Sequence, residues 1–446
     1  MRTNHTTHQT HEKANVNGLF WFTNDLRLHD NPALATAARS ADTLLCVYCI
    51  NSDLLTPNRF GSVGLGAHRQ RFLHESLVDL RQKLAALNQE LLIIEGSPAR
   101  TLANLIDEFK IDHIFASRNA GWNENKVWQS VTEHCSESRF TQIDSHTLFD
   151  LDSLPFDLQN LPASFTQFRK IIEQHNTEKP ITTLIHLPPP PFGIKAETTI
   201  EKNHSDSRFK GGEAQGLAHL THYFSGNLPA NYKQVRNAID GWDNSCKLSP
   251  WLANGSLSSR EVLHWLHEYE LNKIKNESTY WIYFELLWRE YFHWLAHKIG
   301  TQLFSFSGLK SAAPLSSYYP ERFKKWVAGN TPYPLVNACM KELAATGYLS
   351  NRGRQIVASC LVNELSIDWR YGAAYFEQVL LDYDVAANWG NWQYLAGVGV
   401  DTRNKRHFNL DKQTQLFDPA GEYRSKWHAE KPSTPLDSMD AADWPI

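Results

Sequence analysis

Short apolar runs alternate with helical patterns over the first third of the chain, and this alternation constrains the fold more than any other feature. Five runs predict β-strands, at Leu19–Thr23, Thr43–Ile50, Leu91–Glu95, Ile111–Ser117 and Arg139–Ile143. The stretches between them predict helices, at Pro32–Arg39, Ala67–Leu87, Pro98–Phe109 and Glu124–His134. Strands that alternate with helices form a parallel sheet with helices on both faces. We therefore predict a doubly wound α/β domain over residues 18–145, with a ligand crevice at the carboxyl ends of its strands.

The rest of the chain predicts a different architecture. Residues 146–215 are polar and rich in proline, which indicates a long linker on the surface rather than a core. Its prolines include Pro155, Pro162, Pro180 and Pro188–Pro191. From residue 216 to about residue 430 the strand signals disappear, so we expect an all-α second domain. Residues 1–17 and 431–446 are polar, and we expect two disordered tails.

The composition bounds the class of protein. A chain of 446 residues is too long for one ordinary core, and 42 % hydrophobic with 21 % charged residues is typical of a soluble globular protein. We find no apolar run long enough to span a membrane and no signal peptide, which predicts a cytoplasmic protein. The formal net charge of −4 argues against coating nucleic acid by bulk electrostatics, although a local basic rim is compatible with it.

The six cysteines form no disulfide or zinc pattern. Cys46 and Cys49 lie within one predicted strand, where residues three apart point to opposite faces, so we expect two buried thiols. His5, His8 and His11 lie in the amino-terminal tail and would bind a metal only weakly. We predict no metal site.

Residues 351–400 place charges and aromatic rings in helices that are otherwise apolar enough to be buried. The motifs are Asn-Arg-Gly-Arg-Gln at 351–355, Ile-Asp-Trp-Arg at 367–370, Asp-Tyr-Asp at 382–384 and Asn-Trp-Gly-Asn-Trp-Gln-Tyr at 388–394. Buried charges need ions, hydrogen bonds or a ligand. Arg354 and Asp382 could be a structural ion pair. The repeated combination of donors, acceptors and flat rings indicates a polar, planar, largely buried cofactor.

Two further segments carry candidate site residues. In the helix predicted over residues 280–295, Glu285 and Arg289 share one face with Trp288, and a polar cavity explains this pair better than burial alone. Ser249 begins a helix whose positive end, with the hydroxyl of Ser245, could bind a diphosphate, although Ser-Pro begins many helices that bind nothing. The segment from residue 258 to residue 261 is a capping box that we interpret as structural.

Residues 351–400 resemble the flavin-binding core of the photolyase/cryptochrome superfamily, and three of their motifs resemble its DASH cryptochrome branch. The resemblance extends from about Gly18 to about Glu430, and Gln355 stands where conventional photolyases carry Met. It implies an α/β antenna domain followed by an all-α FAD-binding domain. No G-x-G-x-x-G motif follows the first strand, which agrees with a flavin bound in the helical half.

The resemblance implies which residues bind cofactors. FAD would contact Tyr232, Ser245, Lys247, Leu248, Ser249, Arg289, Asn351, Arg354, Asp382, Asp384 and Asn388. In this set Arg354 would pair with Asp382, Asp384 would face the isoalloxazine, and Asn388 would lie beside its reactive nitrogen. A methenyltetrahydrofolate-type antenna would be contacted by Asn123 and Glu124, which also form an ordinary helix start.

The resemblance also implies a reaction, in which reduced, anionic FAD gives an electron to a cyclobutane pyrimidine dimer under light and recovers it after the dimer splits. The catalytic residues would be Glu285, Trp288, Asn351, Trp369, Asn388 and Trp392. Glu285 would contact the dimer and Trp288 would stack on it. Trp392 and Trp369 would be the inner members of a tryptophan relay that photoreduces the flavin, or they could simply be core packing.

DNA is the partner that the resemblance implies, and the DASH branch acts best on single strands, where the dimer need not leave a duplex. The contacts would come from Arg236, Trp288, Arg352, Gln355, Tyr394, Lys405 and Arg406. The basic run from 403 to 407 could line the cavity mouth, although a short basic run is more often a solvated face. We expect a monomer. A blue-light photoreceptor without repair activity is the main alternative, and a light-independent flavin redox enzyme is a third, although no nicotinamide site is visible.

The chain departs from the family pattern at several positions. The outer tryptophan of the relay is expected about where Ser316 stands, and the nearest aromatic residues are Tyr318 and Tyr319. We therefore expect photoreduction that is slow or uses a tyrosine. Cys246 replaces a usual Thr, and Asn337, after an altered turn at residues 329–334, replaces a usual Asp. We expect these changes to affect the electrostatics on the substrate side of the site more than flavin binding.

Overall fold

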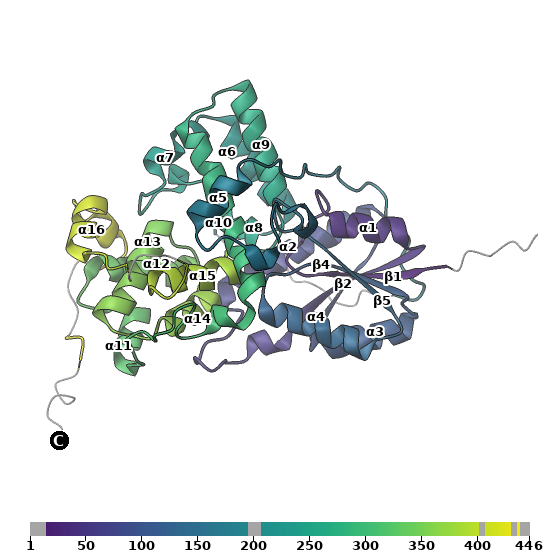
Figure 1. The fold of residues 1–446 in the computed structure, drawn as a ribbon, viewed down its shortest axis with the longest axis horizontal. Coiled ribbons are helices and arrows are strands. Elements are labelled where there is room, and N and C mark those ends of the chain that lie inside the picture. The colour runs from purple at the N-terminus through teal and green to yellow at the C-terminus, as the bar shows by residue number, and fades with distance from the viewer. Residues whose placement is uncertain (1–14, 195–206, 401–405, 430–434, 438–446) are drawn as a thin grey trace, which may run out of the picture.

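The computed structural model describes residues 15–194, 207–400, 406–429 and 435–437. Figure 1 shows an α/β part that holds the amino-terminal strands and a helical part that holds the carboxyl-terminal half. His5, His8 and His11, and most of the two predicted tails, lie outside the described residues. The predicted residue limits of the linker and the second domain stay predictions.

The α/β part is built on a five-stranded parallel sheet with the order β3-β2-β1-β4-β5. Its strands are β1 (Asn17–Phe22), β2 (Thr43–Asn51), β3 (Leu91–Gly96), β4 (His113–Ser117) and β5 (Arg139–Ile143). Its helices are α1 (Pro32–Ser40), α2 (Ala67–Ala86), α3 (Pro98–Phe109) and α4 (Trp122–His134). The predicted fold class is confirmed, with boundaries that shift by only one or two residues.

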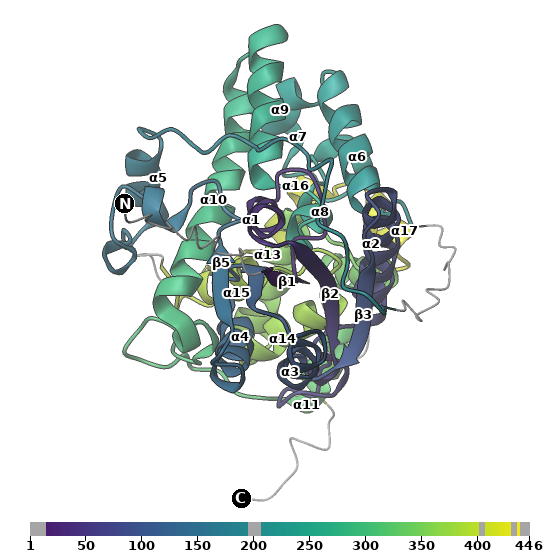
Figure 2. The same cartoon turned by 90° about the vertical axis from the view of Figure 1, so that its right-hand side faces the viewer.

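Both faces of this sheet are covered, which explains why its strands are continuously apolar. Phe20 and Phe22 point to the face that α1 and α2 cover, and Leu19 and Trp21 point to the face that α3 and α4 cover. Figure 2 shows the two helix layers on either side of the strands. The thiols in β2 are buried and all six cysteines are free, as predicted.

The segment between the two parts contributes to the core, so the prediction of a purely surface linker is wrong. Its helix α5 (Phe165–Ile172) buries Phe165, Phe168 and Ile172 in the core of the helical part. Further along, Leu187 belongs to the core beside the sheet. Proline content indicated irregular backbone correctly, but it does not report where the few large apolar side chains of a segment are buried.

The helical part contains no strand among its described residues, as predicted. Its helices are α6 (Glu213–Ser225), α7 (Tyr232–Val235), α8 (Ser249–Ala253), α9 (Ser259–Asn272), α10 (Glu277–Ile299), α11 (Pro320–Val327), α12 (Pro334–Thr346), α13 (Asn351–Ser359), α14 (Trp369–Val379), α15 (Val385–Leu395), α16 (Leu410–Phe417) and α17 (Glu422–Lys426). The central helix α10 begins at a capping box made by Asn276 and Thr279. It packs against α5, α7, α9 and α15, so it positions side chains at several interfaces at once.

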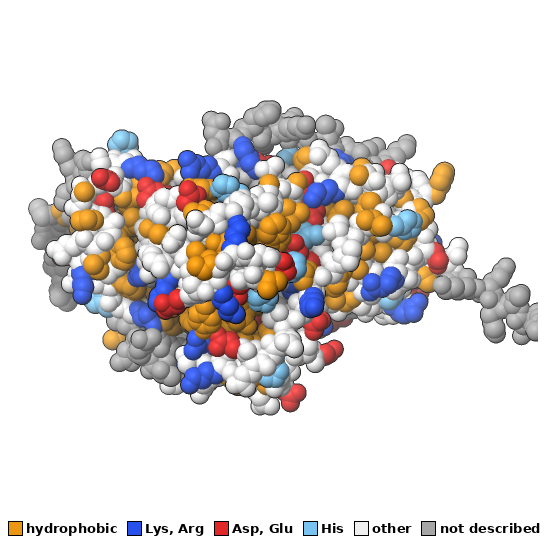
Figure 3. Space-filling view, turned by 90° about the horizontal axis from the view of Figure 1, so that it is seen from above, with side chains coloured by type: hydrophobic (Ala, Val, Ile, Leu, Met, Phe, Trp, Pro, Cys, Tyr) orange, Lys and Arg blue, Asp and Glu red, His pale blue; other side chains and the backbone are white. Residues whose placement is uncertain are grey.

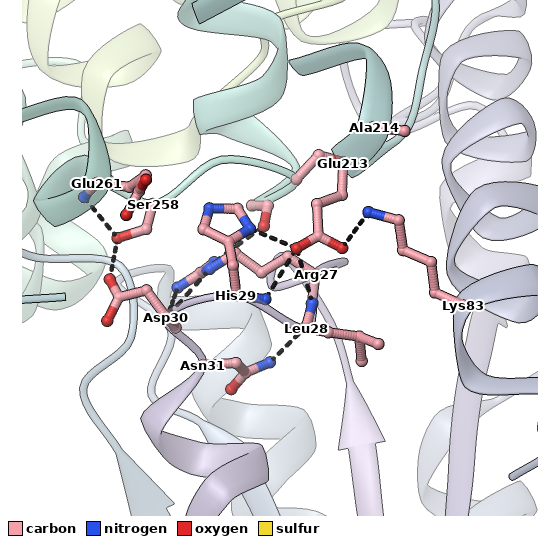
Figure 4. Close-up of polar contacts among 12 residues, drawn as sticks. Arg27, Leu28, His29, Asp30, Asn31, Lys83, Glu213, Ala214, Ser258 and Glu261 are labelled. Carbon is pink, nitrogen blue, oxygen red and sulfur yellow. Dashed lines mark hydrogen bonds and ion pairs between the residues drawn. The ribbon is translucent and has the colours of Figure 1, made fainter. Parts of the chain in front are cut away.

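A buried polar network joins the two parts (Figure 4). The carboxylate of Glu213, at the start of α6, contacts the His29 ring and accepts from the Lys83 ammonium at 2.6 Å. Burial alone would raise the pKa of Glu213, but the hydrogen bonds and charges of these partners lower it to about 2. Ser258 donates to Asp30 and caps α9 by accepting from two backbone N–H groups, which confirms the predicted helix start.

None of the described helices combines the length and the apolar character that crossing a membrane requires.

Candidate functional site

A cavity of 1250 Å³ lies between the α/β part and the helical part. Its wall includes Asn123 and Glu124 from the first turn of α4, together with Arg289, His293 and Asp384 from the helical part. Burial within this wall raises the pKa of the Glu124 carboxyl. The volume exceeds the ~300–1,000 Å³ typical of small-molecule pockets, so the cavity is large enough for a bound small molecule. The two residues assigned to the antenna therefore share one cavity with two of the residues assigned to FAD.

Asp384 is held by hydrogen bonds as an ionised carboxylate. One oxygen lies 2.6 Å from Nε2 of His293, and the other accepts the backbone N–H of Ala387 at 2.9 Å. The Arg289 guanidinium lies 3.8 Å away. Burial alone would raise the pKa of Asp384, but the charge and hydrogen bond of His293, followed by the charge of Arg289, hold it well below its usual range. A fixed negative charge thus lies on the cavity wall at the start of α15.

Glu285 and Arg289, which were predicted to line one polar cavity, have different partners. Glu285 forms an ion pair with Arg236, which follows α7. Arg289 donates instead to the backbone carbonyls of His146 and Leu252. The two side chains of one helix face therefore have different surroundings: Glu285 lies in a partly exposed ion pair, and Arg289 lies in the wall of the interdomain cavity.

The predicted pairing of Arg354 with Asp382 is confirmed. One guanidinium nitrogen of Arg354 donates to both carboxylate oxygens, at 2.9 and 2.8 Å, and Nε donates to the carbonyl of Leu349 at 2.9 Å. The ring of Tyr348 lies 5.5 Å from this guanidinium. The pKa of Tyr348 is raised, mainly by burial, so its phenol stays protonated and can donate a hydrogen bond.

Lys247 is a buried cation beside this pair. It is 8 % exposed, its ammonium donates to the hydroxyl of Ser245 at 3.0 Å, and it lies 5.2 Å from the ring of Tyr348. Burial lowers its pKa, while Cys246, Glu342 and Asp240 raise it through charge. Within the described part of the chain it forms no ion pair with a carboxylate. A buried ammonium without an anionic partner fits a ligand that brings negative charge, such as a diphosphate.

The predicted helix start at Ser249 is confirmed, but a helix dipole adds little to the diphosphate prediction. The helix α8, which begins at Ser249, has only five residues, too short for a substantial dipole. The remaining support comes from Lys247 and the hydroxyl of Ser245. Leu248 and Tyr232 are buried nearby and supply apolar and aromatic surface.

Two asparagines predicted at the flavin occupy different environments. Asn388 is buried, and its amide donates to the carbonyl of Ala373 at 3.0 Å, which links α15 to α14. Asn351 is the exposed first residue of α13. The hydroxyl of Ser350 caps this helix by accepting the N–H of Gly353 at 3.1 Å.

A second group of predicted residues forms a polar cluster on the helical part, made of Arg236, Glu285 and Arg352 beside the ring of Trp281. The guanidinium of Arg236 lies 4.2 Å from the ring of Trp281 while it pairs with Glu285. Arg352 donates to Asn237 at 3.1 Å. Burial and the nearby charge of Arg236 lower the pKa of Arg352. Two cations, a carboxylate and an aromatic ring are therefore brought together from three segments.

Trp288 does not have the open stacking face that was expected. Phe165 of α5 stacks on one face, with ring centroids 3.8 Å apart and planes 10° apart. Phe292 covers the other, at 5.4 Å and 28°. Tyr394 meets Trp288 in an edge-on arrangement at 6.0 Å. A nucleobase could lie on the face of Trp288 only if Phe165 moved.

The remaining residues predicted at DNA are partly described. The guanidinium of Arg406 lies 4.3 Å from the ring of Tyr394, which in turn meets Trp288 edge-on. Gln355 is half-buried in α13, and Lys405 lies outside the described residues. On the face shown in Figure 3, Lys and Arg side chains are interspersed with acidic and apolar ones rather than gathered in one large patch.

The two predicted relay tryptophans are buried and have different ring partners. Trp369 lies 5.8 Å from Trp389, and its indole N–H donates to the carbonyl of Phe306 at 3.0 Å. Trp392 packs 5.1 Å from Phe376. It fits against α14 because Gly372 has no side chain there, and a Cβ at that position would lie 2.3 Å from the indole.

Asn337 has a structural role, although its identity was expected to affect the substrate side. Its side-chain oxygen accepts the backbone N–H of Thr331 at 2.7 Å, and its amide donates to the carbonyl of Thr331 at 2.7 Å. It is buried and ties the altered turn to α12.

Sequence reasoning missed several residues of the site. Tyr348 joins Lys247 to Arg354, His293 orders Asp384, and Phe165 covers Trp288. Tyr348 could have been suspected because it lies three residues before the Asn-Arg-Gly-Arg-Gln motif. No local signal connects Phe165 to a helix that begins more than one hundred residues later.

Comparison with known proteins agrees with this architecture. A family model described as DNA photolyase matches residues 18–190, and one described as FAD binding domain of DNA photolyase matches residues 281–444. A Cryptochrome DASH of Idiomarina loihiensis is 51 % identical and covers 96 % of this chain and 96 % of its own length. A Cryptochrome DASH of Vibrio parahaemolyticus is 46 % identical and covers 96 % of this chain and 97 % of its own length.

Solved structures are similar as well. A cryptochrome from Synechocystis sp. superposes with a TM-score of 0.88 at 38 % identity, over 95 % of this chain and 91 % of that chain. A bacterial class III photolyase from Agrobacterium tumefaciens superposes with a TM-score of 0.80 at 26 % identity, over 94 % of this chain and 88 % of that one.

The fold and the site define a two-domain protein whose helical half is an FAD-binding domain of the photolyase type. The chain belongs to the photolyase/cryptochrome superfamily, in its cryptochrome DASH family. The residues present fit FAD. Buried Lys247 lacks an anionic partner among the described residues, and the Arg354–Asp382 pair lies next to it across Tyr348.

Proposed function

We propose that this protein repairs cyclobutane pyrimidine dimers in single-stranded DNA, using light and FAD bound in its helical domain. The main support for the proposal is that the first turn of α13 contributes one side chain to the predicted cofactor site and another to the predicted nucleic-acid site. Arg354 pairs with buried Asp382. Arg352 donates to Asn237 in the polar cluster that also holds Arg236 and Glu285. A cofactor at the first and a nucleic acid at the second would be neighbours across one helical turn.

The chain's own residues would hold and orient the cofactor. Lys247 and Ser245 would bind the diphosphate, and the Arg354–Asp382 pair would position a polar ring edge. FAD, when bound, would supply the light-absorbing redox ring. Because Lys247 and Asp382 are buried, the site would exclude water from the bound ring.

The polar cluster, together with Arg406 and Tyr394, would hold the nucleic acid. Arg236, Arg352 and Arg406 would neutralise phosphates, and the half-buried rings of Trp281 and Tyr394 would contact bases at their faces or edges. A single strand is favoured because taking a dimer out of a duplex costs a few kcal/mol. We propose that the protein acts as a monomer.

We also propose that the interdomain cavity binds a methenyltetrahydrofolate-type antenna. Asn123 and Glu124 lie in its wall, and the Glu124 carboxyl could pair with the N–H groups of a pterin-like ring. An absorption spectrum of the purified protein would test this, because such a folate absorbs in addition to the flavin. A spectrum with flavin bands alone, even after incubation with the folate, would refute it.

The repair proposal is tested by illuminating the chemically reduced protein with oligothymidine that contains pyrimidine dimers. We expect dimers to disappear under blue light and to persist in the dark. Persistence of dimers in the light, with FAD fully bound, would refute repair and would favour the alternative of a blue-light photoreceptor that binds FAD and nucleic acid.

A further inference from the structure

A loop beside α14 lacks a tryptophan but carries two exposed tyrosines. The hydroxyl of Ser316 is buried and has no hydrogen-bond partner among the described residues. The next residue pairs with the chain that leads into α14, since Asp368 N–H donates to the Ser317 carbonyl at 2.8 Å and Ser317 N–H donates to the Ser366 carbonyl at 3.0 Å. This pairing places the residues after Ser317 against the first turn of α14.

The two tyrosines have different partners although their exposure is nearly equal. Tyr318 is 40 % exposed and stacks on Tyr371 of α14, with ring centroids 4.0 Å apart and planes 12° apart. Tyr319 is 42 % exposed and lies under the guanidinium of Arg322, at 4.5 Å. Only the first of them is stacked on a ring that reaches the interior.

Ring contacts lead from Tyr371 to Trp369. Phe60, from the loop before α2, lies 5.2 Å from Tyr371 and 6.3 Å from Trp389. Trp389 in turn lies 5.8 Å from Trp369. Phe60 is not itself oxidised, but it fills the gap through which an electron can tunnel between the tyrosine and the tryptophan.

A second set of ring contacts leads from Tyr371 to Trp392. Phe323 lies 5.7 Å from Tyr371 and 6.0 Å from Trp326. Trp326 lies 6.3 Å from Trp392. Both tryptophans that sequence analysis assigned to flavin photoreduction are therefore connected to the surface through Tyr371, and Tyr318 is the exposed end of both routes.

We propose that the stacked pair Tyr371 and Tyr318 is the electron entry through which an external thiol reduces the protein's flavin in light. The inference rests on the proposed flavin function. Trp392 gives one electron to the light-excited oxidised flavin, and the electron that Trp392 lost is replaced through the aromatic contacts from Tyr318. The phenolic proton of Tyr318 passes to water, and the thiol returns a hydrogen atom to the phenoxyl oxygen and leaves as a thiyl radical.

The exposure of the two rings suits these roles. The pKa of Tyr371 is raised, mainly by burial, so its phenol stays protonated at neutral pH. Tyr371 therefore passes electrons from Tyr318 to the rings behind it. The exposed ring of Tyr318 is in contact with water, which can accept its proton and which brings the thiol to it.

The test compares Tyr318→Phe and Tyr371→Phe with the matched control Tyr319→Phe in the FAD-loaded protein. We expect the rate of light-driven flavin reduction by a small thiol to fall at least about tenfold in the first two, equal to about 1.4 kcal/mol in the barrier. The control should keep the rate of the unaltered protein. Flash-freezing under illumination should trap a tyrosyl radical, identified in electron paramagnetic resonance with ring-deuterated tyrosine, that both test variants lack.

Different measurements test electron entry through the tyrosines and the proposed repair of dimers. Dimer repair by chemically reduced protein should be equal in all variants, because it needs no outside electron during the reaction. An unchanged photoreduction rate and radical yield in Tyr318→Phe and Tyr371→Phe would overturn the inference while repair stands. Equal slowing in Tyr319→Phe, or no light-driven reduction in the unaltered protein, would overturn it as well.

Discussion

Replacing Glu213 by Gln should lower the free energy of unfolding by weakening the contact between the α/β and helical parts. The carboxylate accepts the Lys83 ammonium at 2.6 Å and the backbone N–H of His29 at 2.8 Å, and it contacts the His29 ring. Gln keeps the shape of the side chain and resembles the protonated carboxyl. The variant therefore isolates the contribution of the negative charge.

The magnitude follows from the pKa of Glu213. Burial alone would raise it, but His29 and Lys83 lower it from 4.5 to about 2. At ~1.4 kcal/mol per pKa unit, this lowering contributes about 3 kcal/mol to the free energy of unfolding near neutral pH. Because the folded pKa lies below the unfolded one, the stabilisation is complete above about pH 4.5 and is lost as the pH falls toward about 2.

The assay is urea unfolding of both proteins, followed by tryptophan fluorescence. We expect Glu213→Gln to lose about 3 kcal/mol at about pH 7 and only about 2 kcal/mol at about pH 3.5. Glu321→Gln is the control, because the pair that Glu321 forms with Lys324 is 66 % exposed on the glutamate side and should contribute less than about 1 kcal/mol. Equal losses in the two variants, or a Glu213→Gln effect that does not change with pH, would refute this account.

Three further predictions concern the site. Lys247→Met should weaken FAD binding by about 1.5–3 kcal/mol, measured by flavin fluorescence titration of the apoprotein, and an unchanged affinity would remove Lys247 from the diphosphate site. Arg352→Gln should weaken oligothymidine binding and reduce the slope of log affinity against log salt by about 1, whereas the same slope as the unaltered protein would place Arg352 outside the DNA contact. Trp288→Ala should lower the free energy of unfolding by about 3–5 kcal/mol, because Phe165 and Phe292 cover the ring; a variant of full stability would show that this packing is not formed.

The architecture could be predicted because it depends on local periodicity. Alternating apolar runs and helical patterns located the five strands and four helices of the α/β part, and the disappearance of strand signals located the helical part. The linker was predicted less well, because a few large side chains such as Phe168 decide its burial and they leave no periodic pattern. The pairing of Arg354 with Asp382 followed from the resemblance of two complete motifs.

Contacts between distant segments could not be predicted in this way. The shared helix face of Glu285 and Arg289 predicted that both line one polar cavity, but Glu285 pairs with Arg236, forty-nine residues away, and Arg289 lies in the wall of the interdomain cavity. The identity of Ser316 indicated a missing ring, and it did not indicate which of the two nearby tyrosines would stack on Tyr371. Such choices depend on how whole helices pack.

The sequence by itself determined the order of strands and helices, the buried thiols and the presence of a polar, aromatic-rich cofactor site, because these follow from residue types at short and regular spacing. Only the tertiary structure decided which side chains share a wall, so that Asp384 and Glu124 line one cavity and Phe165 closes a face of Trp288. The physical reason is that the direction of a side chain depends on its own helix or strand, which the local sequence determines. Its neighbours depend on how segments that are far apart in the sequence pack against one another.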